Sequence, residues 1–242
     1  MLLHDYGLPR GYAVNDVSAV EHLSRDPLKY QAGVYRKAAE ILKDQGLDSV
    51  LDVGCGMPEK LLRYVAPVSS AITGVDLPES VSAFREAERF AFGDWIAMDL
   101  ERSPGLLGSR FDLVIAADVI EHLRDPDRLL AWICAHSDER TWILLSTPDR
   151  STLGVSRRGP PRNPHHVREW SRREFRRYLR GRGFGLVESL ALREPDGYSC
   201  HLCVCRRPHE PCGELARALG EISAEAEADS GATRTTLGRD NA

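Results

Sequence analysis

The 242-residue sequence has a formal net charge of −4, with 42% hydrophobic and 28% charged residues. This length accommodates one α/β domain with a full core and short appendages. The weak negative charge argues against a general affinity for nucleic acids or anionic membranes, and apolar runs fall short of the roughly 20 residues of a membrane span. Because the first residues also lack a signal-peptide pattern, we expect a cytoplasmic protein.

The cysteines are expected to be reduced thiols. No paired CxxC arrangement, which zinc spacing would need, is present. Cys203 and Cys205 alternate along an expected strand and so share one of its faces. The full set is Cys55, Cys134, Cys200, Cys203, Cys205 and Cys212.

Residues 1–25 are weakly patterned and form an N-terminal arm, after which residues 26–45 are expected to be a helix. Asp26-Pro27 suits a helix start and Gly46 a helix end. Strands and helices then alternate, which predicts a parallel sheet covered on both faces. The expected strands are 49–53, 70–76, 95–98, 111–117 and 141–146, and the expected helices are 59–65, 79–90 and 126–135.

The alternation stops at residues 147–170, a long segment rich in proline, glycine and arginine. A loop of this length in a compact domain is usually functional or disordered. Ser171 and Glu174 form a capping box that predicts a helix over 171–182. Strands at 184–192 and 198–205, joined by a Pro-Asp-Gly turn, are expected to form an antiparallel hairpin.

The fold expected for residues 26–206 is therefore a single domain, followed by a tail at 207–242. The tail is rich in alanine and acidic residues with few large apolar groups, so we expect it to be disordered.

A glycine bend follows the first expected strand, in the stretch Asp52-Val53-Gly54-Cys55-Gly56. Such a bend lets the backbone approach a ligand closely and directs a helix N-terminus toward it. The third glycine of the dinucleotide motif would fall on Glu59 and is absent. The pattern resembles the first motif of class I S-adenosylmethionine (SAM) methyltransferases. The resemblance implies a Rossmann-like, seven-stranded α/β fold, mostly parallel with a final antiparallel strand.

Further residues follow in the order that this family requires. Asp76 ends the second strand about 20 residues after the bend, where a carboxylate can accept hydrogen bonds from both ribose hydroxyls. NAD-binding proteins use an acid in the same way. The resemblance implies that Asp99 contacts the adenine amine and that Leu100 offers a backbone N–H. The implied SAM-binding residues are Asp52, Gly54, Cys55, Gly56, Asp76, Leu77, Asp99, Leu100 and Asp118.

Two further segments, Asp118-x-x-Glu121-His122 and His166-x-x-Glu169-Trp170-Ser171, are candidates for catalysis. They resemble segments of ubiquinone-biosynthesis O-methyltransferases and small-RNA 2′-O-methyltransferases. That resemblance implies a divalent metal (Mg, Mn, Fe or Zn) bound by Asp118, Glu121, His122 and His166, although those families have glutamate where this chain has Asp118. Such a metal would lower the pKa of the acceptor hydroxyl.

Two readings without a metal remain open for the same segments. His122 or His166 would serve as a general base, because imidazole titrates near neutrality. Alternatively, Glu121 and His122 cap a helix and His166 packs against Trp170. The catalytic candidates are therefore His122, His166 and Asp118.

The expected activity is SAM-dependent methyl transfer to a hydroxyl of a small molecule such as a sugar, polyketide or quinone, with N-methylation still open. The loop arginines Arg157, Arg158, Arg162 and Arg168 would suit an anionic acceptor, whereas those at 172–180 suit a solvated helix face. Alternatives are RNA 2′-O-methylation, for which a large basic surface is missing, a non-catalytic SAM-binding protein and an NAD(P) oxidoreductase. The sequence does not indicate the oligomeric state.

Overall fold

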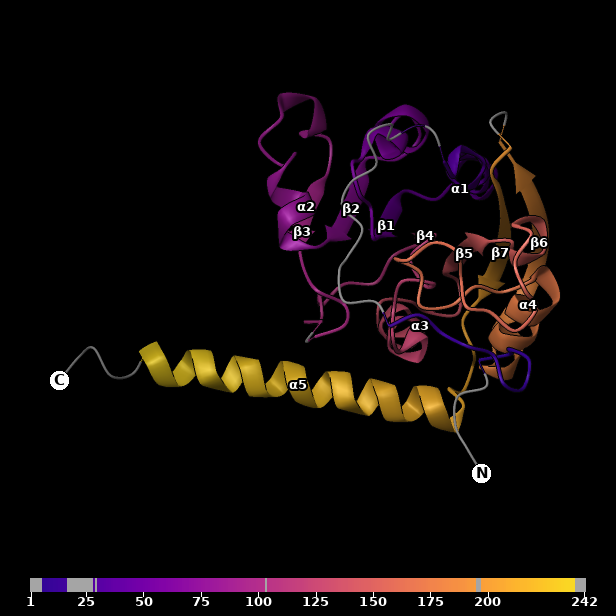
Figure 1. Ribbon diagram of the computed structural model, residues 1–242. Coiled ribbons are helices and arrows are strands. Elements are labelled where there is room, and N and C mark those ends of the chain that lie inside the picture. The colour runs from indigo at the N-terminus through magenta and orange to yellow at the C-terminus, as the bar shows by residue number, and fades with distance from the viewer. Residues whose placement is uncertain (1–5, 17–27, 29, 103, 195–196, 238–242) are drawn as a thin grey trace.

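The computed structural model describes residues 6–16, 28, 30–102, 104–194 and 197–237. A seven-stranded sheet with the order β3-β2-β1-β4-β5-β7-β6 forms its centre (Figure 1). β1 to β5 pair in parallel, and β7 runs antiparallel to both β5 and β6, which confirms the predicted fold class. The strands are β1 (Ser49–Val53), β2 (Ala71–Asp76), β3 (Asp94–Ala97), β4 (Leu113–Ala117), β5 (Trp142–Pro148), β6 (Gly185–Arg193) and β7 (Ser199–Arg206).

Helices cover both faces of the sheet. They are α1 (Ala32–Gln45), α2 (Pro78–Ser82), α3 (Pro126–Ala135), α4 (Arg172–Gly181) and α5 (Gly213–Leu237), with a π-helical turn at Leu61–Val65 and 3-10 turns at Glu88–Phe90 and Arg150–Thr152. Side chains alternate along the strands, so Val114 and Ala116 join the core under α3, α4 and α5, while Leu113 and Ile115 join the core under α1 and α2.

Two helices are shorter than the sequence predicts. α1 begins at Ala32 because Gln31 has a left-handed backbone, with φ 63°, that interrupts a helix; the predicted start at Asp26-Pro27 lies outside the described residues. The helix expected over 79–90 ends at Ser82, and Ala87 is already extended. There Trp95 Nε1 donates a hydrogen bond to Phe90 O at 2.8 Å, so tertiary contacts define this segment.

The prediction of disorder after residue 207 is wrong for the first half of α5. Leu215, Ala218 and Ile222 are buried in the same core cluster as α3. Their spacing of three and four residues places them on one face of the helix. Arg128 of α3 and Glu225 of α5 add an ion pair at 2.7 Å, and Figure 1 shows α5 running below α3.

The N-terminal arm packs on the segment that follows β5. Ala13 N donates a hydrogen bond to Arg158 O at 2.7 Å, and Asn15 N donates to Val167 O at 3.0 Å. Residues 6–16, the part of the arm that the structure describes, are thus packed on the domain. The six cysteines are free thiols in this structure. In the part of the chain that the structure describes, no helix is long and apolar enough to cross a membrane.

Candidate active site

The glycine bend between β1 and the following turn has the backbone geometry that the sequence predicts. Gly54 and Gly56 have positive φ values of 70° and 53°. A Cβ on Gly54 would lie 2.4 Å from Val119 Cγ2, so only glycine fits there without displacement. The N–H groups of Gly54 and Cys55 donate to Val75 O at 2.8 and 3.2 Å, which fastens the bend to β2.

Asp76 lies beside this bend at the carboxyl end of β2. Its Oδ2 accepts a hydrogen bond from Gly56 N at 2.7 Å, and its Oδ1 accepts one from Leu77 N at 2.7 Å. The structure therefore brings Gly56, Asp76 and Leu77 together at one edge of the sheet, as the sequence predicts. A carboxylate oriented in this way can accept hydrogen bonds from a vicinal diol.

Asp52 lies beneath the bend and is completely buried. Tyr35 of α1 donates a hydroxyl hydrogen bond to Asp52 Oδ2 at 3.0 Å. Burial raises the pKa of the Asp52 carboxyl to about 7, against the lowering effects of Tyr35 and Lys60. Asp52 therefore supports the bend from below, and Tyr35 is a partner that sequence spacing did not reveal.

Asp99 and Leu100 follow β3 at the same edge of the sheet. Met98 N donates to Asp76 O at 2.7 Å, which continues the β2–β3 pairing to within one residue of Asp99. Asp99 Oδ1 accepts from Glu101 N at 2.9 Å. Leu100 is partly buried against the core. The predicted adenine contacts thus flank Asp76, as the order of parallel strands requires.

Asp118 follows β4 in a strained conformation. Its φ of 55° is uncommon for a residue other than glycine, and such strain often marks functional sites. Ser146 Oγ donates to Asp118 Oδ1 at 2.5 Å, and the Tyr198 hydroxyl donates to Oδ2. Burial raises the pKa of the Asp118 carboxyl, and the Ser146 hydrogen bond acts in the opposite direction. Sequence analysis missed Ser146 and Tyr198 because they come from β5 and the approach to β7.

Glu121 is fully buried near the end of β4. Neither of its carboxylate oxygens has a hydrogen-bond partner among the described residues. Burial, and then the charge of Asp118, raise the pKa of Glu121 well above its usual range. Burying an ionised carboxylate without a hydrogen-bond donor costs free energy, and a bound proton or cation would remove this cost.

His122 and His166 form a pair of perpendicular rings whose centroids are 4.8 Å apart. His122 Nδ1 lies 2.9 Å from His165 O, so in the neutral ring Nδ1 carries the proton and Nε2 the lone pair. His166 Nδ1 contacts Glu169 Oε1 at 2.7 Å, and its Nε2 contacts Asn163 Nδ2 at 2.9 Å.

Three of the four predicted metal ligands come together in this structure. Ligand atoms of Glu121, His122 and His166 all lie within 4.8 Å of one another. Asp118 is outside this group, and its two oxygens are held by Ser146 and Tyr198. The group is assembled across the fold, since Val167 N donates to Glu121 O at 2.8 Å. One carboxylate and two imidazoles can bind a divalent cation or move a proton.

The family model described as "Methyltransferase domain" matches residues 23–189. A probable S-adenosylmethionine-dependent methyltransferase of Mycolicibacterium smegmatis is 30% identical over 143 residues, covering 59% of this chain and 54% of that protein. A ubiquinone biosynthesis O-methyltransferase of Bordetella parapertussis is 28% identical over 105 residues, covering 42% of this chain and 43% of that one. The chain therefore spans about half the length of these curated relatives.

Solved methyltransferase structures share the fold. A Burkholderia thailandensis 1,6-didemethyltoxoflavin-N1-methyltransferase, bound to its substrate and S-adenosylhomocysteine, superposes with a TM-score of 0.53 at 23% identity, covering 74% of this chain and 80% of that one. A magnesium protoporphyrin IX methyltransferase of Synechocystis gives a TM-score of 0.52 at 18% identity, covering 73% and 83%. With a family model that matches most of its length, this chain belongs to the class I SAM-dependent methyltransferases.

Proposed function

We propose that this protein transfers the methyl group of SAM to a hydroxyl group of a small-molecule acceptor. The observation that carries this proposal is the group of Glu121, His122 and His166 beyond the carboxyl end of β4, near Asp118, in which Glu121 and His166 are buried and His122 is half-buried. Sequence similarity to ubiquinone biosynthesis O-methyltransferases supports a hydroxyl acceptor. We assign this activity to the domain formed by residues 26–206. The cytoplasmic location of the protein stays a prediction.

For the cofactor, we propose that SAM lies over the glycine bend. Asp76 would accept hydrogen bonds from the ribose hydroxyls, and Asp99 with Leu100 would contact the adenine. Gly54, Cys55 and Gly56 would line the methionine part, with Asp52 holding the bend from below through Tyr35. Asp118 would face the methionine end of the cofactor or the acceptor.

The residues of the candidate site fit a divalent cation. The buried Glu121 carboxylate lacks a donor among the described residues, and it lies within reach of both histidines. A mixed oxygen and imidazole set suits Mg, Mn, Fe or Zn. When bound, such a cation would act as a Lewis acid that lowers the pKa of the acceptor hydroxyl.

The protein's own side chains can complete the transfer. The acceptor oxygen attacks the SAM methyl carbon as the carbon–sulfur bond breaks, which forms the ether and S-adenosylhomocysteine. In the alternative without a cation, the hydroxyl proton passes to His122 Nε2, the nitrogen left with the lone pair when Nδ1–H donates to His165 O. A bound cation would instead be held by this nitrogen and would lower the pKa of the acceptor hydroxyl. Glu169 and Asn163 hold His166 in place beside His122.

Methyl transfer from labelled SAM to a panel of phenols, sugars, quinols and amines tests this function. His122→Asn should lower kcat by about 100-fold or more, because it removes the proton acceptor, while the Kd for S-adenosylhomocysteine stays within about twofold. Activity lost with EDTA and restored by Mn or Zn would establish the cation; activity unaffected by EDTA would leave His122 as a metal-free base.

Two results would contradict the proposal. One is calorimetry showing no S-adenosylhomocysteine binding to the folded protein, or showing the same affinity after Asp76→Ala, which should weaken binding by about tenfold or more. The other is turnover of amines alone, which would make the protein an N-methyltransferase.

A further inference from the structure

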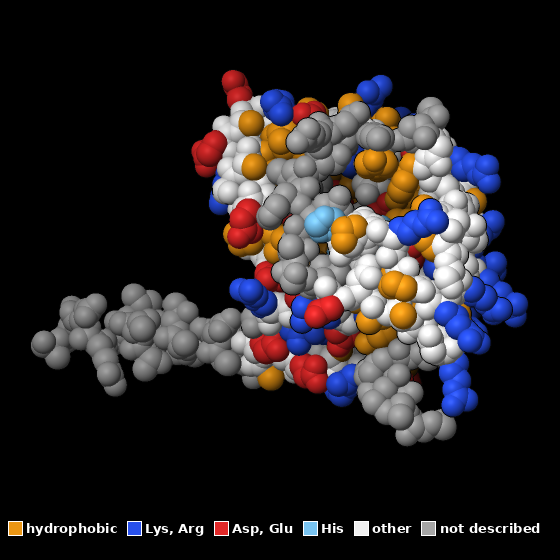
Figure 2. Space-filling model, viewed as in Figure 1, with side chains coloured by type: hydrophobic (Ala, Val, Ile, Leu, Met, Phe, Trp, Pro, Cys, Tyr) orange, Lys and Arg blue, Asp and Glu red, His pale blue; other side chains and the backbone are white. Residues whose placement is uncertain are grey.

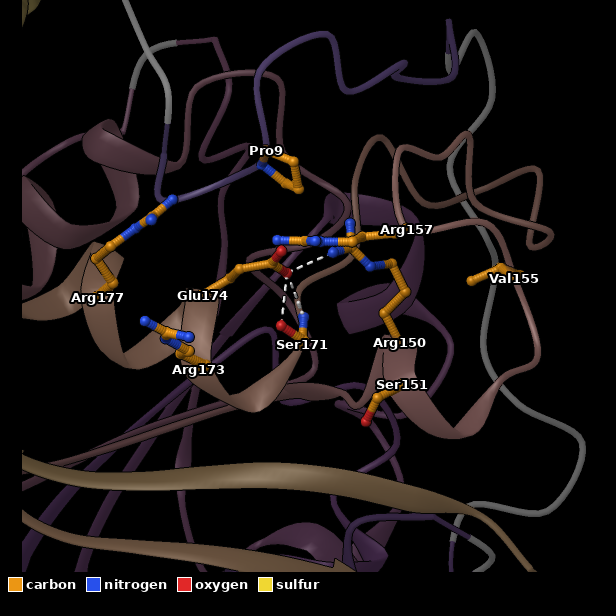
Figure 3. Close-up of a pocket in the computed structure, with 9 residues that line it drawn as sticks. All are labelled: Pro9, Arg150, Ser151, Val155, Arg157, Ser171, Arg173, Glu174 and Arg177. Atoms are coloured by element: carbon orange, nitrogen blue, oxygen red, sulfur yellow. Dashed lines mark hydrogen bonds and ion pairs between the residues drawn. The ribbon is translucent and has the colours of Figure 1, made fainter.

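A pocket apart from the candidate active site, with a cavity of about 410 Å³, lies where the N-terminal arm, the turn after β5 and the start of α4 meet (Figure 3). Arginines dominate its lining: Arg150, Arg157, Arg173 and Arg177. Glu174 is the only acidic residue that lines it among the described residues. Lys and Arg side chains also gather on the side of the molecule that carries β6 and α4 (Figure 2).

Arg150 is the deepest of these arginines, with only 4% of its surface exposed. Its Nη2 pairs with Glu174 Oε2, and its Nη1 donates to Glu169 O at 3.2 Å. The same Glu174 oxygen also accepts hydrogen bonds from Ser171 N at 2.8 Å and Ser171 Oγ at 2.7 Å. The single carboxylate of the pocket is thus already engaged by the helix cap and by Arg150.

Two further guanidinium groups of the lining, those of Arg157 and Arg173, have no carboxylate partner among the described residues. Both side chains are exposed. In Figure 3 the Arg157 side chain extends from the loop toward α4, which carries Arg173 and Arg177. Arg173 and Arg177 are four residues apart on one helical face, a spacing at which like charges repel.

We propose that this pocket binds an oxyanion group, a phosphate or carboxylate borne by a small organic molecule. Guanidinium groups bind such anions through paired, charge-assisted hydrogen bonds, and an anion in the pocket would offset the positive charge that Arg157 and Arg173 bring to it. The cavity is within the size range of small-molecule sites and exceeds what a single ion needs.

Glu169 connects the pocket to the candidate active site, although it does not itself line the pocket. Arg150 bonds to the backbone oxygen of Glu169, while the Glu169 carboxylate contacts His166. The anion is therefore either the charged end of the acceptor or a separate metabolite bound beside the site. This inference goes beyond the proposed function, because neither the fold nor methyl transfer requires an arginine pocket.

The loop after β5 and helix α4 each carry arginines that line the pocket and arginines that do not. Of the four loop arginines, only Arg157 lines the pocket; Arg168 is buried and donates to Leu123 O at 2.7 Å and Arg124 O at 2.8 Å. Arg158 and Arg180 do not line it. The double variant Arg158→Gln/Arg180→Gln therefore matches Arg157→Gln/Arg173→Gln in charge and in the elements changed.

Calorimetric titration of the full chain with inorganic phosphate and phenyl phosphate, at constant ionic strength, tests the pocket. The wild type should bind both saturably. Arg157→Gln/Arg173→Gln should weaken binding by about tenfold or more, and Arg158→Gln/Arg180→Gln by less than about twofold. Competition between phenyl phosphate and the acceptor found in the methyl-transfer panel would identify the anion as part of the acceptor; inhibition without competition would identify a separate metabolite.

Either of two results would overturn the inference: no saturable phosphate binding to the wild type, or equal weakening in the two double variants. S-adenosylhomocysteine titrated into the same samples reports on the proposed function separately. Retained cofactor binding without phosphate binding would reject the pocket alone, and phosphate binding without cofactor binding would reject the methyltransferase assignment alone.

Discussion

Neighbouring acidic residues of the candidate site have different tasks because their surroundings differ. Both carboxylate oxygens of Asp76 accept hydrogen bonds from backbone N–H groups at the carboxyl end of β2. Asp52 is completely buried and bonded to Tyr35, with its Oδ1 unpaired among the described residues. The pKa of Asp52 is consequently raised to about 7, with burial as the largest cause. Residue type alone would not have separated Asp76, the proposed ribose contact, from Asp52, which supports the bend.

Asp52→Asn should reveal this burial through the pH dependence of stability. In the unfolded chain an Asp titrates near 3.9, so the native state, with its pKa of about 7, holds the proton more tightly. The resulting stabilisation is complete below about pH 4 and is lost as the pH rises to about 7. The free energy of unfolding of the wild type relative to Asp52→Asn should therefore fall by about 2 to 3 kcal/mol between pH 5 and 7. Urea unfolding followed by tryptophan fluorescence measures it.

Asp44→Asn on the exposed side of α1 is the matched control, with an expected change within about 0.5 kcal/mol. A difference between Asp52→Asn and wild type that stays constant from pH 5 to 7 would show that Asp52 is ionised throughout.

At the scale of elements, α5 shows how a weak apolar pattern can still form a packed helix. Its buried residues are few, but Leu215, Ala218 and Ile222 lie on one face and meet the core beneath α3. The composition of residues 207–242 averages this apolar face with the polar faces of the helix. For this reason the composition predicted disorder. The ion pair between Arg128 and Glu225 adds a polar contact at the edge of the same interface.

Leu215→Ala should therefore destabilise the protein by about 2 to 4 kcal/mol, because it opens a cavity at a fully buried position. Ser223→Ala, on the exposed face of α5, should change the free energy of unfolding by less than about 0.5 kcal/mol. Denaturant unfolding of both variants gives the comparison. Equal stability of the two would mean that α5 is not packed on α3 in solution.

At the scale of the whole molecule, the N-terminal arm holds the segment that carries His166. The Asn15 side-chain amide lies 3.1 Å from each of three backbone oxygens, those of Pro161, Asn163 and His166. Asn15 N also donates to Val167 O at 3.0 Å. These contacts join residues about 150 positions apart and restrict the loop between β5 and α4.

Asn15→Ala should loosen this loop without affecting the cofactor site. Backbone amides of residues 161–167 should exchange hydrogen for deuterium about tenfold faster, since each 1.4 kcal/mol lost from local stability raises exchange tenfold. The Kd for S-adenosylhomocysteine should stay within about twofold. Hydrogen–deuterium exchange by mass spectrometry measures the first effect. Val14→Ala, at a neighbouring position that is 54% exposed, should leave exchange unchanged.

Sequence by itself determined the features that local patterns report. The bounds of β1 and α3 agree with the prediction because apolar periodicity, Asp125 as cap and Pro126 as first residue act within one element. The sequence also placed the glycine bend and Asp76 correctly. Each follows a strand, and parallel strands bring their carboxyl ends to the same side of the sheet.

Tertiary structure decided the rest. The partners of Asp118 come from β5 and from Tyr198, 80 positions away. The group of Glu121, His122 and His166 forms only when the loop after β5 folds back on Glu121. The arginine pocket likewise needs the arm, the turn at Arg150 and α4 together. Contacts between distant segments leave no periodic trace in the chain, because each segment satisfies only its own local pattern until packing selects which of them meet.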